Sequence, residues 1–169
     1  IVVIAAEVGV LSIGLPVWAQ IAGNDAAAVK IRIVGKQFEW VAHYPGPDGK
    51  WSDYDPKQVE GGLNPIGIKD AEYTDDIDAP GVIIVPVGRT VQLQIRSMDV
   101  LHSFTVPLWR TKQDAVPGLP TRTQVRPTVA GKYEITCAEL CGMGHFRMRA
   151  FAKVVSAAEF EKWLTDNAP

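Results

Sequence analysis

Residues 82–106 read VIIVPVGRTVQLQIRSMDVLHSFTV, and this stretch decides the fold class. Apolar and polar residues alternate at 91–96, which is the period of a strand with one buried face. A short apolar run, 82–85, precedes this segment, and Pro86 and Gly88 give turn signals between the two. Another short strand, 103–106, is predicted after it and is closed by Pro107. No helical period intervenes. The stretch therefore predicts consecutive short strands of an all-β sandwich or barrel.

The strand pattern continues in both directions. Upstream, alternation runs through 29–33 and resumes at Phe38 and Trp40. Further strands are predicted downstream at 123–129, 132–136 and 149–155. Residues 48–80 have little periodicity and many Gly, Pro and Asp residues, so we expect a long irregular loop there. We expect one domain over 29–155 that contains this loop.

A helix is predicted at each end of the chain. Residues 1–22 carry a single charge, Glu7, and as a helix they would span about 33 Å, enough to cross a membrane. They lack the Met and the basic start of a signal peptide, so a transmembrane helix is favoured over a signal sequence or a buried helix. Residues 23–28 would form a linker. A short helix over 156–169 is predicted because Ser156 and Glu159 have the spacing of a capping box.

The charge distribution is uneven although the formal net charge is only −2. Residues 48–78 hold nine Asp and Glu against three Lys and Arg, whereas residues 89–153 hold ten Lys and Arg against four Asp and Glu. The acidic stretch could attract a cationic partner or be a solvated loop, and charge alone leaves both open. The net charge does not favour a nucleic-acid partner.

Metal-binding side chains are concentrated near the C-terminal end. The twelve residues 137–148 contain both cysteines of the chain, Cys137 and Cys141. They also contain His145 and Met148. A disulfide or a zinc site would also use such cysteines, but a thioether is a poor zinc ligand and a familiar weak axial ligand of copper. Two thiolates on one loop can bridge a pair of copper ions, which then need a second His from elsewhere.

The residues alone leave two candidates for that second His. His43 lies in a segment, 42–46, that we expect to be a solvent-facing turn. His102 lies after the predicted strand 91–96, where a lone His is more often structural.

Four motifs, in order along nearly the whole chain, resemble subunit II of the haem–copper cytochrome c oxidases. Residues 137–148 match the family pattern C-x-E-x-C-x-x-x-H-x-x-M at every ligand position, and residues 99–104 match D-V-x-H-S-F. Residues 112–118 resemble the loop K-x-D-A-I-P-G, and residues 35–40 resemble the strand G-x-Q-W-x-W.

The resemblance implies a fold and a binuclear copper centre, CuA. The fold would be a cupredoxin-like Greek-key β-sandwich. Cys137 and Cys141 would bridge two copper ions, and His102 and His145 would each bind one of them. Met148 and the backbone carbonyl of Glu139 would be the axial ligands. The Glu139 side chain would reach a magnesium ion shared with subunit I.

The resemblance also implies a function and partners. The subunit would accept electrons from a c-type cytochrome, or a complex containing one, and pass them to haem a of subunit I. Oxygen would be reduced there, at haem a3 and CuB, with proton pumping. Other membrane subunits would be further partners. The chain would be anchored in a bacterial plasma membrane with the copper domain on the periplasmic side.

Two departures from the family pattern concern electron transfer. In this family a tryptophan usually accepts the electron from the donor, and Phe38 occupies the corresponding position in this chain. The second tryptophan of the motif is kept as Trp40. Phe38 and Trp40 are therefore the expected contacts with the donor. Leu119 follows Pro117-Gly118 where the family commonly has Arg. The alternatives are a nitric-oxide reductase subunit with the same copper centre, or a membrane-anchored copper-storage or chaperone protein.

Overall fold

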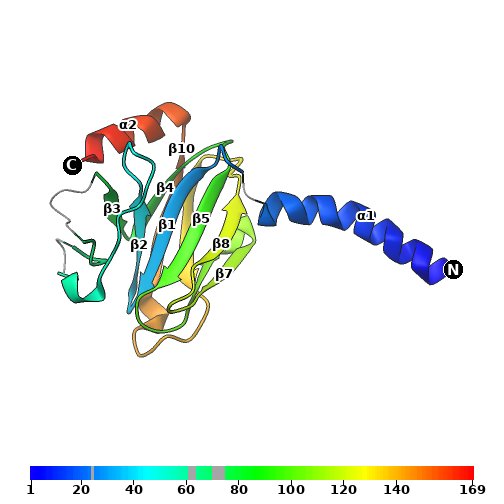
Figure 1. Cartoon of the computed structure of the whole chain (residues 1–169), viewed down its shortest axis with the longest axis horizontal. Helices are drawn as coiled ribbons and strands as arrows, with labels where there is room; N and C mark the ends of the chain where they lie inside the picture. The colour runs from blue at the N-terminus through cyan, green and yellow to red at the C-terminus, as the bar shows by residue number, and fades with distance from the viewer. Residues whose placement is uncertain (24, 61–63, 70–74) are drawn as a thin grey trace.

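A computed structural model describes the chain except for residues 24, 61–63 and 70–74 (Figure 1). Helix α1 (Val2–Ala22) leads into β1 (Val29–Lys36) and β2 (Glu39–Tyr44). A short 3-10 helix, η1 (Pro56–Gln58), precedes the closely spaced strands. These are β3 (Ile77–Pro80), β4 (Val82–Pro86), β5 (Val91–Ser97), β6 (His102–Val106), β7 (Thr111–Ala115), β8 (Thr121–Val125), β9 (Gly131–Cys137) and β10 (Arg149–Val155). Two more 3-10 turns, η3 (Pro107–Trp109) and η4 (His145–Arg147), and helix α2 (Ala157–Asn167) complete the described chain.

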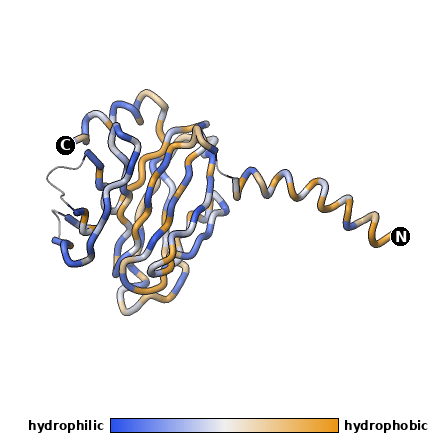
Figure 2. Tube along the Cα trace, viewed as in Figure 1, coloured by the Kyte–Doolittle hydropathy of each residue, from blue (hydrophilic) through white to orange (hydrophobic). Residues whose placement is uncertain are grey.

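The described strands form two five-stranded sheets packed face to face. One has the order β3-β2-β1-β5-β8 and the other β4-β10-β9-β6-β7. The pairs β1–β5 and β10–β4 are parallel, and the other neighbours are antiparallel. Alternate side chains of the central strands meet between the sheets, where Ile31, Ile33 and Leu93 are fully buried. Figure 2 shows these apolar strands inside the domain. The predicted β-sandwich is confirmed.

Tyr44 joins the two sheets. Its hydroxyl, carried by β2, donates to the Ile84 carbonyl of β4 at 3.0 Å and accepts from the Ile84 N–H at 2.7 Å. The ring is 1% exposed, and this burial raises the pKa of the phenol above its ordinary value. Helix α2 covers this end of the sandwich, since Trp163 packs against the Tyr44 ring with 4.8 Å between centroids. The predicted capping box of Ser156 and Glu159 is present at the start of α2.

Three predictions about the strands need correction. Strand β3 lies inside the stretch 48–80 that was expected to be irregular, and part of that stretch lies outside the described residues. Strand β7, with the sequence TKQDA, was not predicted. It is an edge strand with one fully buried side chain, Ala115, so it lacks the apolar alternation of a central strand. The predicted strand at 123–129 is instead β8, which begins at Thr121 and ends at Val125.

His43 was expected in a solvent-facing turn and is instead fully buried in β2. Its Nδ1 lies 2.6 Å from Oδ1 of Asp78, and its Nε2 lies 3.1 Å from Oδ2 of Asp76. The strand continues to Tyr44 before the chain turns, and the two carboxylates compensate for burial of the polar ring.

Helix α1 stands apart from the sandwich and has no buried residue (Figure 1). It is 21 residues long with a mean hydropathy of 2.0, so by length and composition it is able to cross a membrane. Its C-terminal end is tied to β8, where the Gln124 side chain donates to the Gly23 carbonyl and accepts from the Asp25 N–H at 3.4 Å.

Candidate metal centre

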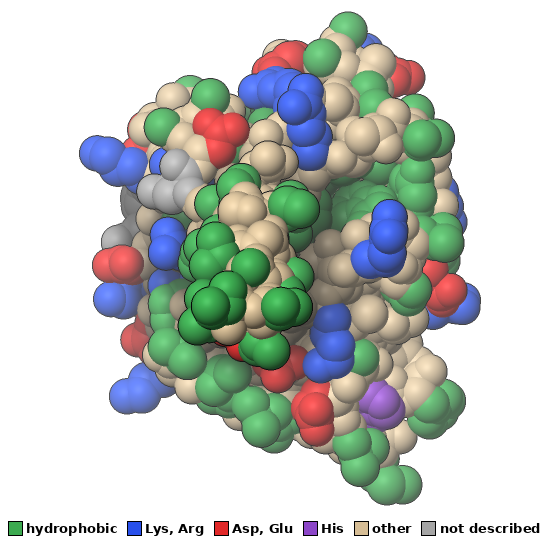
Figure 3. Space-filling model, turned by 90° about the vertical axis from the view of Figure 1, so that its right-hand side faces the viewer, with side chains coloured by type: hydrophobic (Ala, Val, Ile, Leu, Met, Phe, Trp, Pro, Cys, Tyr) green, Lys and Arg blue, Asp and Glu red, His purple; other side chains and the backbone are tan. Residues whose placement is uncertain are grey.

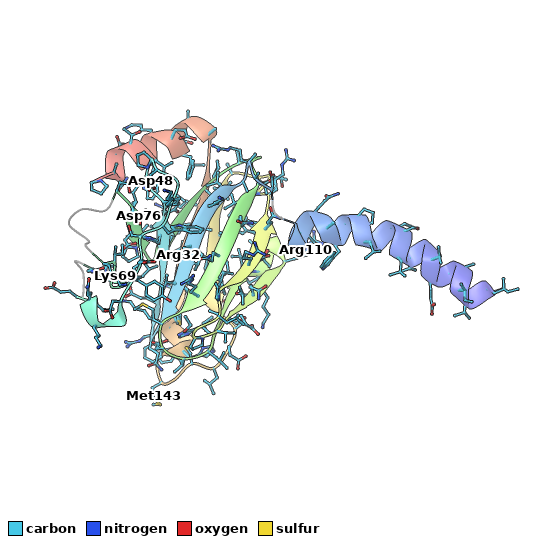
Figure 4. All side chains as sticks on the ribbon, in the orientation of Figure 1. Arg32, Asp48, Lys69, Asp76, Arg110 and Met143 are labelled. Atoms are coloured by element: carbon cyan, nitrogen blue, oxygen red, sulfur yellow. The ribbon has the colours of Figure 1, made fainter. Side chains whose placement is uncertain are left out.

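The predicted ligands meet at one end of the sandwich. Strand β9 ends at Cys137, and the chain then turns through a loop, 138–148, before β10. His102 begins the neighbouring strand β6, which pairs with β9 at Phe104 and Cys137. A hydrogen bond of 2.9 Å from the Ala138 N–H to the Ser103 carbonyl holds the loop against β6. Figure 4 shows Met143, on this loop, at the end of the domain.

The soft donor atoms form one cluster around the two thiols. The Sγ atoms of Cys137 and Cys141 lie 3.9 Å apart, and both cysteines are free. Nδ1 of His102 lies 3.9 Å from the Cys137 sulfur. Nδ1 of His145 lies 3.5 Å from the Cys141 sulfur. Each thiol therefore faces one imidazole, as two bridging thiolates with one terminal His per metal would require.

Two weaker donors flank the thiols. The Met148 Sδ lies 3.7 Å from the Cys141 sulfur, and the Glu139 carbonyl oxygen lies 3.2 Å from the Cys137 sulfur. The Met148 side chain is 2% exposed, so the thioether points into the cluster rather than to solvent. All six predicted ligands are thus brought together, although His43 is not among them.

Burial affects the ionisation of the Cys141 thiol. Cys141 is 4% exposed, and desolvation together with the neighbouring Cys137 raises the pKa of its thiol to about 11. Without metal, the Cys141 thiol therefore keeps its proton at neutral pH. Metal binding must release that proton, so the affinity of this site for metal increases with pH.

A hydrogen bond to Asp99, which is supported in turn by Gln37, holds the His102 ring in place. Its Nε2 lies 2.7 Å from Oδ1 of Asp99, so Nδ1 is left to face the thiols. The other oxygen of Asp99 accepts from the Gln37 N–H at 2.7 Å, and the Gln37 side-chain amide donates to the Cys141 carbonyl at 2.5 Å. Burial opposes the ionisation of Asp99, but these hydrogen bonds outweigh it and lower the pKa of the carboxyl.

Glycines allow two aromatic rings to pack closely against the site. A Cβ on Gly35 would lie 2.8 Å from the Trp40 ring and 3.2 Å from the His102 ring. A Cβ on Gly144 would lie 2.4 Å from the Phe38 ring. The end of β1 therefore packs closely against the His102 ring, and the turn between β1 and β2 packs against the metal-binding loop.

Comparison with known proteins agrees with this geometry. Residues 29–155 match the model of the cytochrome c oxidase subunit II periplasmic domain. The chain belongs to this family. It is 38% identical over 157 residues to the alternative cytochrome c oxidase subunit 2 of Bradyrhizobium diazoefficiens, covering 91% of this chain and 56% of that protein. It is 32% identical over 173 residues to cytochrome c oxidase subunit 2 of Cereibacter sphaeroides, covering 96% and 56%.

A solved structure shares the fold. The crystal structure of the periplasmic domain of subunit II of cytochrome oxidase from Bradyrhizobium japonicum superposes with a TM-score of 0.62 at 28% identity, covering 85% of this chain and 95% of that one. The cupredoxin-like sandwich expected for subunit II is confirmed. The chain spans just over half the length of the Bradyrhizobium diazoefficiens and Cereibacter sphaeroides relatives.

The two expected electron contacts of this subunit II domain differ in exposure. The Trp40 side chain is 1% exposed and packs edge-on against His102, with 5.9 Å between ring centroids. Phe38 is half-buried, and the Arg147 guanidinium lies 5.8 Å from its ring centroid. Of the two rings, Phe38 has the larger exposed surface. Its role and that of Trp40 stay predictions.

The sequence did not reveal the contacts made by Asp99 and Gln37. Asp99 lies three residues before His102, and a carboxylate at that spacing from a metal-binding His is a usable signal. Gln37 reaches Cys141 across 104 positions of sequence, and nothing local to either residue marks that pair.

Replacing Asp99 by Asn should weaken copper binding by roughly 10- to 100-fold, because the His102 ring loses its charged partner. A copper titration of the purified chain against a competing chelator measures this. Asp114→Asn is the matched control, since Asp114 is exposed and bonds Ser103 rather than a ligand. Equal copper affinities in wild type and Asp99→Asn would show that Asp99 does not position His102.

Proposed function

We propose that this chain is the electron-accepting subunit of a haem–copper oxidase and holds a binuclear CuA centre. The observation that carries the proposal is the pair of thiols 3.9 Å apart, each facing its own imidazole. The donor set fits copper, because thiolate, imidazole and thioether are soft or borderline ligands. Cys137 and Cys141 would bridge the two ions, His102 and His145 would bind one each, and Met148 and the Glu139 carbonyl would be axial.

The surrounding residues suit electron transfer rather than chemistry on a bound substrate. Bound copper supplies a reversible one-electron couple. The chain would offer six donor atoms to the two ions, which would leave no position for a substrate. Met148 and His102 are nearly or fully buried, and the β-strands on either side hold their positions. Such a closed site argues against copper storage or delivery, which needs an open and exchangeable site.

The exposed end of the domain would contact the partners. Leu140, Met143 and Phe146, on the metal-binding loop, are 77%, 93% and 87% exposed. Apolar side chains at that level of exposure are typical of a protein contact surface. We infer that this loop meets subunit I, which carries haem a, haem a3 and CuB. The exposed Glu139 side chain would share a magnesium ion there. With α1 in a bacterial plasma membrane, the domain would lie on the periplasmic side.

The donor would be a c-type cytochrome that contacts the domain at Phe38. This ring touches the backbone of the metal-binding loop near Gly144 and retains exposed surface. Trp40, which contacts the His102 ring, would carry the electron from Phe38 toward the metal ligands.

Replacing Phe38 by Ala should slow reduction of the centre by a reduced c-type cytochrome by at least about tenfold, because the donor loses its closest contact. Stopped-flow absorbance of the copper-loaded chain measures the rate. Phe146→Ala is the matched control, because it removes an aromatic ring from the same end at 87% exposure. A loss of rate in the control alone would place the donor on the loop instead.

The test of the proposed function is electron paramagnetic resonance of the copper-loaded chain, with copper quantified per chain. Hyperfine structure from one electron shared by two equivalent copper nuclei would support the binuclear centre. A single-copper pattern, or one tightly bound ion per chain, would contradict it. Reduction by a c-type cytochrome, followed by transfer to haem a in the purified oxidase, would separate an oxidase subunit from a nitric-oxide reductase subunit.

A further inference from the structure

A large open groove lies beside the end of α1, remote from the copper ligands. It has a volume of about 790 Å³ and is bounded by η3, β7, β8 and the segment after β8. Ile21, in the last turn of α1, forms part of its wall. Figure 3, viewed from the α1 side, shows the surface hollowed beside the helix, with Lys and Arg side chains near the hollow.

The groove is basic. Arg110, Lys112 and Arg126 line it, and no Asp or Glu is among the described residues of its wall. Arg110 forms no ion pair with any described residue, and it adopts a left-handed conformation with φ of 53° at the end of η3. Lys112 also pairs with Asp114 at 3.0 Å, and Arg126 donates to the Gly88 carbonyl at 2.8 Å.

The rim of the groove is apolar and aromatic. Leu108 and Val129 are 77% and 64% exposed, although each is a large aliphatic side chain. Trp109 and Tyr133 pack together with 5.5 Å between ring centroids. Aromatic rings beside exposed aliphatic groups and cations are typical of the level of lipid headgroups.

The position of the groove beside the end of α1 determines its level relative to the membrane surface. Because α1 ends at Ala22, a membrane crossed by this helix has its surface near Ile21 and Ala22. Figure 4 shows Arg110 next to this end of α1, whereas Lys69 lies on the opposite side of the domain. The cationic side chains of the groove therefore face the layer in which phospholipid phosphates lie.

We propose that this groove binds the phosphate headgroup of an anionic phospholipid in the leaflet from which α1 emerges. Arg110 and Arg126 bind the phosphate oxygens, with Lys112 adding positive charge. Leu108, Trp109 and Val129 contact the upper part of the acyl chains. The inference rests on α1 crossing the membrane, as the proposed function requires, but not on the metal content of the site.

The test is native mass spectrometry of the copper-loaded chain, with α1 intact, in detergent micelles. Phosphatidylglycerol and phosphatidylcholine with identical acyl chains are titrated as probes. Wild type should retain phosphatidylglycerol in preference to phosphatidylcholine. The triple variant Arg110→Gln, Lys112→Gln, Arg126→Gln should lose at least about tenfold in phosphatidylglycerol affinity, since each basic residue at an anionic surface contributes roughly fivefold.

Matched variants keep the test decisive. Lys50→Gln, Lys57→Gln, Lys69→Gln makes the same change of charge on the loop far from α1 and should leave the lipid preference unchanged. If the triple variant at the groove fails to fold, Arg110→Gln alone should still lower the affinity roughly fivefold, because Arg110 has no ion pair to lose. An intact copper spectrum shows that each variant is folded.

Four results would overturn the proposal. Equal loss in the two triple variants would mean that net charge alone attracts the lipid. Equal binding of phosphatidylglycerol and phosphatidylcholine by wild type would mean that the groove does not distinguish their headgroups. Displacement of the lipid by an excess of inorganic phosphate would indicate a site for free anions. Absence of the lipid from the purified oxidase, when the isolated chain binds it, would indicate that another subunit covers the groove.

Discussion

Replacing Cys141 by Ser should abolish the electron state shared between two coppers and lower the copper content to at most one ion per chain. The Cys141 sulfur contacts three other donors, at 3.9 Å from the Cys137 sulfur, 3.5 Å from His145 Nδ1 and 3.7 Å from the Met148 sulfur. A serine hydroxyl is a hard donor that keeps its proton, so it does not bridge soft metal ions. Loss of this one sulfur would remove the donor that contacts Cys137 on one side and His145 and Met148 on the other.

The measurement is electron paramagnetic resonance together with copper quantification. Met143→Leu is the matched control, because it removes a thioether from the same loop at a side chain that is 93% exposed. The control should keep the full spectrum and copper content. A Cys141→Ser variant that kept the shared-electron spectrum would show that the assignment of bridging ligands is wrong.

The metal-binding loop was predictable because its ligands are local in sequence. Cys137, Cys141, His145 and Met148 are separated by four, four and three residues, and one tight loop between β9 and β10 brings them together. His102 comes from another strand. The residues alone left both His102 and His43 as candidates, and the assignment of His102 came from the resemblance to subunit II.

The parts that were not predicted depend on contacts between distant segments. Strand β7 has little apolar alternation because its place at the sheet edge requires few buried side chains. His43 looked exposed because polar and turn-forming residues follow it, and its burial becomes intelligible only with Asp76 and Asp78, more than thirty residues later. Pairing across such distances is decided by the tertiary fold and leaves no local pattern.

The cluster of His43, Asp76 and Asp78 fastens the long loop after β2 to the sheet. The side chains of His43 and Asp76 are fully buried. Asp76 also accepts from the Ser52 N–H at 2.7 Å and the Gly46 N–H at 3.0 Å, so one carboxylate holds both ends of the segment 46–52. Burial opposes its ionisation, but these hydrogen bonds and the electrostatic interaction with His43 lower the pKa of Asp76 below its ordinary 3.8.

Replacing Asp76 by Asn should lower the free energy of unfolding by about 1–3 kcal/mol, because the Ser52 and Gly46 N–H groups and the buried His43 ring exchange a carboxylate partner for a neutral amide. Denaturant unfolding near pH 7 measures this. Asp53→Asn is the matched control, since Asp53 is an exposed carboxylate on the same loop, and it should change stability by no more than about 0.5 kcal/mol.

The pH dependence of the free energy of unfolding provides an independent test of the role of Asp76. A carboxyl whose pKa is lowered by folding stabilises the protein above its unfolded pKa, and this stabilisation is lost as pH falls through the folded pKa. Wild type should therefore lose stability below about pH 4, whereas Asp76→Asn should lose less over the same range. Parallel pH profiles for the two proteins would mean that Asp76 is not the carboxylate that holds the loop, and that Asp78 alone compensates the buried His43.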